Sequence, residues 1–138
     1  MIVLDTNIIS ELMRVNADPG VLGWIASLEP DEVFTTTITQ AEILAGLALL
    51  PAGRRRDAIA SEADRAFARL GPRQILQFDS GAARAYADII AIRSRVGRPI
   101  QPMDAQIAAL ARSRSATLAT RNVKDFSDCG VALINPWH

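Results

Sequence analysis

The sequence predicts an α/β fold with a mostly parallel central sheet. Short apolar or β-branched runs alternate with longer segments whose apolar residues recur at helical spacing, as in strands separated by helices. The chain has 138 residues, 49% of them hydrophobic and 22% charged, so it can bury a hydrophobic core as one domain. Because no repeat, low-complexity tract or linker divides it, we expect a single domain over residues 1–138.

The first half of the chain is expected to hold two strands and several helices. Residues 1–4 are apolar and predict a buried strand, and the β-branched tract VFTTTIT at residues 33–39 predicts a second one. Asp18 and Pro19 are typical of the cap and first position of a helix. Other helices are expected at the apolar stripe Ile8, Ile9, Leu12 and Met13, over the sequence AEILAGLALL, and over residues 54–70.

The second half repeats this alternation. Asp79 is placed to cap a helix over residues 80–96, which Gly97 would end. A further helix is indicated by the stripe Met103, Ile107, Leu110 and Ala111. Strands are expected at residues 75–78, 116–120 and 131–134.

The composition excludes several classes of site. Cys129 is the only cysteine and His138 the only histidine, which excludes an intrachain disulfide, Cys/His zinc sites and the usual Ser-His-Asp and Cys-His arrangements. Any metal must therefore be held by oxygen ligands, which favours Mg²⁺ or Mn²⁺. The formal net charge is zero, and we expect a cytoplasmic protein without a membrane span because no apolar run is long enough to cross a bilayer.

Acidic and amide residues recur where the predicted strands end. Asp5 follows the first strand, Glu42 and Asp104 lie in the first turns of two helices, and Asn122 and Asp125 follow the fourth strand. Open α/β sheets bind their ligands beyond the carboxyl ends of the strands. Carboxylates gathered there repel one another, and a divalent cation offsets that repulsion.

Each acid also has a purely structural interpretation. Asp5 can be a helix cap, and Glu42 follows Thr39 at the spacing of a capping box. Asp104 is a typical acid of a first helical turn, and for Asp79 we expect the capping role alone. The spacing of these residues along the chain leaves both interpretations open, because it does not show whether they converge.

Four segments resemble the motifs of PIN domains. They are LDTNIISEL with Asp5, TQAEILAG with Glu42, PMDAQIAALA with Asp104 and LATRNVKDF with Asn122. The four segments occur in the order of the family's motifs and span essentially the whole chain. More narrowly, the chain resembles the VapC toxins of bacterial toxin–antitoxin pairs, in the FitB-like subgroup. The resemblance implies a parallel five-stranded sheet with strand order 3-2-1-4-5.

The resemblance also implies a ribonuclease that depends on Mg²⁺ or Mn²⁺. In the family's pattern, the residues matching Asp5 and Asp104 hold the metal and the one matching Glu42 completes the acidic cluster. Thr6 and Thr120 match hydroxyl residues that line the same site. The chain departs from the pattern at Asn122, where many members carry a fourth acid, and Asp125 is the acid nearest to that position.

By the same resemblance, the protein is the toxin of a type II toxin–antitoxin pair. The implied partners are an RNA substrate, a cognate antitoxin that blocks the active site, and operator DNA reached only through the antitoxin. The implied assembly is a homodimer or a larger toxin–antitoxin complex. The alternative is a weak or inactive PIN-like module that acts with an antitoxin in DNA-binding autoregulation, which Asn122 leaves open.

Two unrelated classes fit the residues less well. A phosphatase with an Asp-x-Asp motif requires a carboxylate at position 7, where this chain has Asn7. A response-regulator receiver requires a lysine near the end of a late strand, whereas the only lysine, Lys124, lies beyond the strand in a loop.

Overall fold

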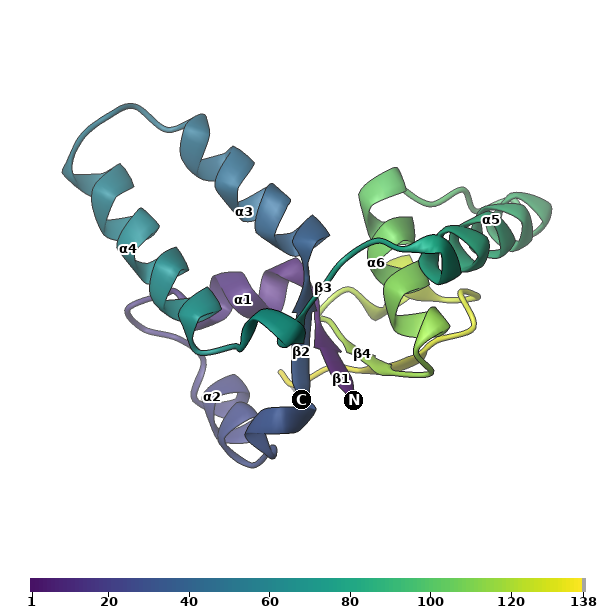
Figure 1. Ribbon diagram of the computed structural model, residues 1–138, viewed down its shortest axis with the longest axis horizontal. Coiled ribbons are helices and arrows are strands. Elements are labelled where there is room, and N and C mark those ends of the chain that lie inside the picture. Colours follow the sequence, from purple (N-terminus) through teal and green to yellow (C-terminus); the bar gives the residue numbers. More distant parts are fainter. Residues whose placement is uncertain (138) are drawn as a thin grey trace.

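The structure, a computed structural model, describes residues 1–137 and shows a five-stranded parallel sheet flanked by helices (Figure 1). The strand order is β3-β2-β1-β4-β5, which confirms the order that the family resemblance implies. His138, which we expect to be part of the C-terminal tail, lies outside the described residues.

The strands are β1 (Ile2–Leu4), β2 (Val33–Thr36), β3 (Ile75–Leu76), β4 (Thr117–Ala119) and β5 (Ala132–Ile134). The α-helices are α1 (Thr6–Leu12), α2 (Pro19–Ala26), α3 (Thr37–Ala48), α4 (Arg54–Ala68), α5 (Ser80–Arg95) and α6 (Pro102–Ser113), and the 3₁₀ turns are η1 (Pro30–Glu32), η2 (Pro72–Gln74) and η3 (Val123–Phe126).

The first strand, β1, lies at the centre of the sheet. It pairs in parallel with β2 on one side and with β4 on the other, so that Leu4 lies opposite Ala119. The backbone N–H of Asp5 continues this pairing by donating to the carbonyl of Ala119 at 2.9 Å. The carboxyl ends of β1 and β4 are therefore adjacent, and the residues that follow them meet at one edge of the sheet.

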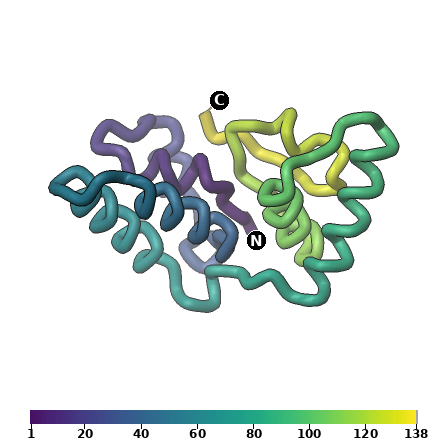
Figure 2. The backbone as a smooth tube through the Cα atoms, turned by 90° about the horizontal axis from the view of Figure 1, so that it is seen from above, coloured from purple at the N-terminus to yellow at the C-terminus, as the bar shows by residue number. Residues whose placement is uncertain are grey.

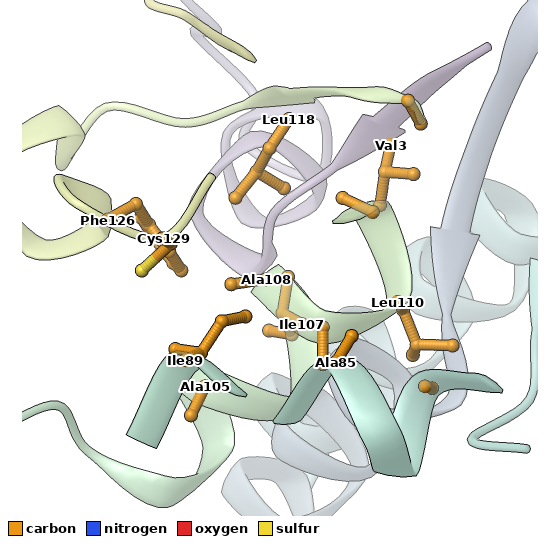
Figure 3. Packing of buried hydrophobic residues seen from close by; sticks show 14 of the residues in the cluster. Val3, Ala85, Ile89, Ala105, Ile107, Ala108, Leu110, Leu118, Phe126 and Cys129 are labelled. Atoms are coloured by element: carbon orange, nitrogen blue, oxygen red, sulfur yellow. The ribbon is translucent and has the colours of Figure 1, made fainter. Parts of the chain in front are cut away.

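Helices cover both faces of the sheet. Figure 1 shows α1 to α4 on one side of the strands and α5 and α6 on the other, and Figure 2 shows the same division from above. The side chains of successive strand residues point to opposite faces, so Val3 packs with the α5–α6 layer while Leu4 packs with the α1–α4 layer. Figure 3 shows the first of these cores, which includes Ile89, Ile107 and Leu118.

The second strand is shorter than the sequence suggested, and the helix after it begins earlier. We expected a strand over residues 33–39 and a helix from residue 41, whereas β2 ends at Thr36 and α3 begins at Thr37. The reason is the hydroxyl of Thr36, which accepts a hydrogen bond from the backbone N–H of Thr39 at 3.0 Å and caps the helix.

The helix caps predicted at Asp18 and Asp79 are confirmed. The side chain of Asp18 accepts from the N–H of Val21, and that of Asp79 accepts from the N–H of Ala82. No helix within residues 1–137 is both long and apolar enough to cross a membrane.

Candidate active site

Asp5 is at once a helix cap and a member of the candidate site. It lies between β1 and α1 with 4% of its surface exposed. One carboxylate oxygen, Oδ1, accepts from the N–H of Thr6 at 2.8 Å, and the other, Oδ2, accepts from the hydroxyl of Thr120 at 2.8 Å. The capping interpretation is therefore right, and it does not exclude a second role for the same carboxylate.

Glu42 is held by hydroxyl groups rather than by a capping box. The helix begins at Thr37, so Glu42 lies in its second turn, not its first, and the expected pairing with Thr39 is wrong. Instead, the Thr6 hydroxyl donates to Glu42 Oε1 at 3.0 Å and lies 3.1 Å from the Thr39 hydroxyl. Since the single hydroxyl hydrogen of Thr6 goes to Glu42, Thr39 is the donor to Thr6.

Thr120 joins the ends of β1 and β4. Its hydroxyl donates to Asp5 and accepts from the side-chain amide of Asn7 at 3.3 Å and from the N–H of Asn122 at 3.0 Å. The Thr120 hydroxyl thus uses its one donor and both of its acceptor positions. Asn7 in turn accepts from the N–H of Arg121 at 3.3 Å, which ties the loop after β4 to α1.

A cavity of about 470 Å³ opens over these residues. Five predicted site residues line it, and Thr120 is buried beside it under Asp5. Asp125 does not line this cavity but faces a smaller one of about 240 Å³, which it shares with Asp104. The lining residues of the larger cavity are Asp5, Thr6, Asn7, Ser10, Glu11, Arg14, Glu42, Asp104, Arg121, Asn122 and Trp137. The structure therefore brings together Asp5, Glu42 and Asp104, which the sequence placed at the ends of different elements.

The carboxylates of the cavity are held in an environment that disfavours their charged form. Burial raises the pKa of Asp5, and the charges of Glu42 and Asp125 raise it further, against the opposing hydrogen bonds from Thr120 and Thr6. Burial also raises the pKa of Glu42, with a contribution from the charge of Asp104.

Asp104 shows the same behaviour. Burial raises its pKa, the charges of Asp5 and Asp125 add to that increase, and the charge of Arg93 opposes it. Within residues 1–137, none of Asp5, Glu42 and Asp104 forms an ion pair with a lysine or arginine. These three carboxylates therefore have no cationic group in direct contact within the described part of the chain.

The donor set fits a hard divalent cation. Carboxylate oxygens are the ligands that Mg²⁺ and Mn²⁺ prefer. A cation would favour the charged form of these carboxylates, against the burial that chiefly raises their pKa values and the repulsion that adds to it. Among the described residues, no three or more Asp, Glu, His or Cys side chains are placed to hold one ion together. A cation would therefore take at most two such ligands and keep waters in its remaining positions, as Mg²⁺ usually does.

Sequence reasoning missed the polar side of the cavity. Glu11 is 5% exposed and forms an ion pair with Arg14, while the guanidinium of Arg121 lies 5.0 Å from the ring centre of Trp137. Trp137 packs against the α1–α4 core and also lines the cavity. The sequence signal was available at Arg121, which directly precedes the candidate site residue Asn122.

The chain belongs to the PIN domain family, whose pattern matches residues 2–130. It is 38% identical to the protein named Toxin FitB of Neisseria gonorrhoeae, over all of this chain and 99% of that protein. It is also 39% identical to the VapC ribonuclease Y4jK of Sinorhizobium fredii, over 99% of this chain and 98% of that protein.

Solved structures show the same likeness. The fold superimposes on a chain of FitAB bound to a DNA fragment with a TM-score of 0.91 and 38% identity, covering all of this chain and 96% of that one. It superimposes on a chain of DNA-bound VapBC from Salmonella typhimurium with a TM-score of 0.82 and 26% identity, covering 98% and 97% of the two chains.

Proposed function

We propose that this protein is the toxin of a type II toxin–antitoxin pair and that it hydrolyses RNA phosphodiester bonds with the help of Mg²⁺ or Mn²⁺. The observation that carries the proposal is the meeting of Asp5, Glu42 and Asp104 in one cavity without a cationic partner among the described residues. Support comes from relatives of matching length that are named as a toxin and a ribonuclease.

In this proposal, Asp5 and Asp104 would hold the cation, and Thr120 keeps the Asp5 carboxylate oriented through its hydrogen bond. When bound, the cation would make a water molecule more acidic and would offset charge on the phosphate. Glu42 orients the attacking water or accepts its proton, a role that its raised pKa suits because a base is most effective when its pKa approaches the working pH. The hydroxyl of Thr6 holds the Glu42 carboxylate in place.

The test is cleavage of RNA by the purified protein. We expect cleavage in Mg²⁺ or Mn²⁺ and none in excess chelator, and we expect Asp5→Asn and Asp104→Asn to lower the rate at least about a hundredfold, as loss of electrostatic stabilisation at an active site does. Arg84→Ala, an exposed change on α5, is the control and should cleave at the wild-type rate. Variants of Asp5 and Asp104 that cut as fast as the wild type would refute the assignment.

The proposed partner is a cognate antitoxin that covers the active site and connects the toxin to operator DNA in the cytoplasm. Solved relatives are described as FitAB and VapBC complexes bound to DNA, which supports a partner protein and a homodimer or larger assembly. Co-expression with an antitoxin gene found beside the gene of this protein should yield a stable complex that no longer cleaves RNA.

A second candidate function rests on Asn122. This residue lines the cavity at the position where many PIN domains have a fourth acid, and an amide adds no negative charge for a second cation. The candidate is a catalytically weak or inactive module that acts with its antitoxin in autoregulation. Metal binding without RNA cleavage would favour it over the enzyme.

A further inference from the structure

The candidate active site has one guanidinium group without a carboxylate partner in the part of the chain that the structure describes. Two arginines line the cavity, Arg14 and Arg121. Arg14 is paired with Glu11 through two hydrogen bonds of 3.1 and 3.2 Å. Arg121 forms no ion pair within residues 1–137, and its guanidinium lies over the indole of Trp137 at 5.0 Å.

The position of Arg121 is fixed at both ends. Its backbone N–H donates to Asn7, which connects it to the hydrogen-bond network around Thr120. Its side chain rests on Trp137, whose ring is anchored by packing against the α1–α4 core. Contact with an aromatic face uses the flat side of a guanidinium and leaves its N–H donors, which lie at the edge, free for another ligand.

An acidic cavity presents a problem to a polyanionic substrate. Three carboxylates repel an incoming RNA strand, and a bound cation can coordinate directly only the phosphate that it contacts. A second positive group beside the carboxylates is needed to hold a neighbouring phosphate. Arg121 lies in that place, and its planar fork of donors matches two oxygens of a phosphodiester group.

We propose that Arg121, positioned by Trp137, binds a phosphodiester group of the RNA next to the bond that is cut. Arg121 would be a substrate-binding residue and Trp137 a positioning residue that acts through it. The proposal rests on the proposed function, since it names the part of the RNA that the same cavity recognises.

The first experiment measures RNA cleavage at fixed Mg²⁺ over a series of NaCl concentrations. We expect Arg121→Ala to raise KM about tenfold and to change kcat less than about twofold, because the lost contact is the same in the bound substrate and in the transition state. We also expect the slope of log affinity against log salt to fall by about 0.7, the value for one phosphate contact to a single strand. Arg121→Lys should have a KM between those of the wild type and Arg121→Ala, since lysine keeps the charge and loses the planar fork.

The second experiment measures binding of a fluorescently labelled single-stranded RNA to proteins that also carry Asp104→Asn, which should slow cleavage enough for binding to be measured. Arg121→Ala should weaken binding about tenfold in this background. Trp137→Ala should weaken binding by a smaller factor and leave the salt slope unchanged, and Trp137→Phe should restore most of the affinity because it keeps an aromatic face. Thermal unfolding of each variant identifies any loss of affinity that results from misfolding.

Arg84→Ala is the matched control, because it removes the same charge from an exposed position on α5 that lines none of the cavities around the site. It should leave KM, affinity and salt slope at the wild-type values. If the wild type cleaves RNA while Arg121→Ala keeps the wild-type KM and salt slope, this inference is wrong and the proposed function stands. If the wild type neither cleaves nor binds RNA, both are wrong.

Discussion

At the scale of single residues, the Asp5 carboxylate caps a helix and lines the candidate site at the same time. Its Oδ1 caps α1 and its Oδ2 meets Thr120, so the two oxygens accept from different elements. The sequence suggested both the cap and the ligand but gave no means of choosing between them. The geometry shows the cap and makes it compatible with a ligand role, because the cap itself holds the carboxylate at the edge of the cavity.

The hydrogen bonds of Asn7 could not be predicted from the sequence. Asn7 was informative only as the residue that argued against a phosphatase, yet its amide connects Thr120 with the backbone of Arg121. These contacts join residues more than a hundred positions apart in the chain. Spacing along the chain does not indicate contacts between such distant residues, so only the structure shows these hydrogen bonds.

The raised pKa values of the site carboxylates have a definite consequence for stability without metal. A carboxyl whose pKa is higher in the folded than in the unfolded protein binds more protons when folded, so stability falls as the pH rises through that interval. For Asp5, Glu42 and Asp104 the interval begins at the usual carboxyl pKa of about 4 and extends upward. Asp79, whose pKa is lowered chiefly by its hydrogen bond to Ala82, acts in the opposite sense and at lower pH.

We therefore predict that Asp104→Asn makes the metal-free protein more stable at pH 7. The gain should be no more than about 1 kcal/mol, because the half-buried site is partly screened by solvent. Acidification from pH 7 to about 5 should stabilise the wild type more than the variant, since the variant lacks one of the groups that take up a proton. Denaturant unfolding in chelator at the two pH values measures both effects, and a variant less stable than the wild type at pH 7 would contradict the argument.

At the scale of elements, the boundary between β2 and α3 decides where Glu42 lies. The run of β-branched residues there is typical of a strand, and the sequence extended the strand to residue 39 for that reason. The structure ends it at Thr36, whose hydroxyl starts the helix, and the hydroxyl of Thr39 turns toward Thr6. Tertiary contacts override local propensity at this point, and they place Glu42 one helical turn further from the sheet than expected.

Helix α5 carries a buried arginine that its helical pattern did not predict. Arg93 of α5 is 4% exposed, and its Nη1 donates to the carbonyls of Asp125 at 2.7 Å and Ser127 at 3.1 Å. Its Nε donates to the carbonyl of Arg98 at 2.6 Å. One side chain thus satisfies the backbone of two loops, including the turn η3 that carries Asp125.

We predict that Arg93→Met lowers the free energy of unfolding by about 3 kcal/mol, because it leaves three carbonyls without their charged donor. Arg95→Met, on the exposed side of the same helix, is the matched control and should change stability by less than about 0.5 kcal/mol. Urea unfolding of the two variants is the measurement. Equal stabilities would mean that the buried guanidinium contributes nothing to holding these loops.

At the scale of the whole molecule, the alternation of strands and helices was enough to predict an α/β fold with a parallel sheet. Strand order was not contained in that alternation and came from the family resemblance, which the structure confirms. The order matters because it puts β1 between β2 and β4, so that the segments after these three strands end at one edge. Convergence of Asp5 and Glu42 is a property of this topology and not of any one element.

The fold therefore explains why an acidic cavity forms where it does, and we propose that Asp5 and Asp104 hold a divalent cation there. The most direct measurement is thermal unfolding at pH 7 of the wild type and of Asp104→Asn, with and without Mn²⁺. A ligand at a hundred times its dissociation constant stabilises the native state by about 2.7 kcal/mol, so the wild-type Tm should rise by several degrees and that of the variant should not. An unchanged wild-type Tm in millimolar Mn²⁺, or an equal rise in both proteins, would contradict the claim.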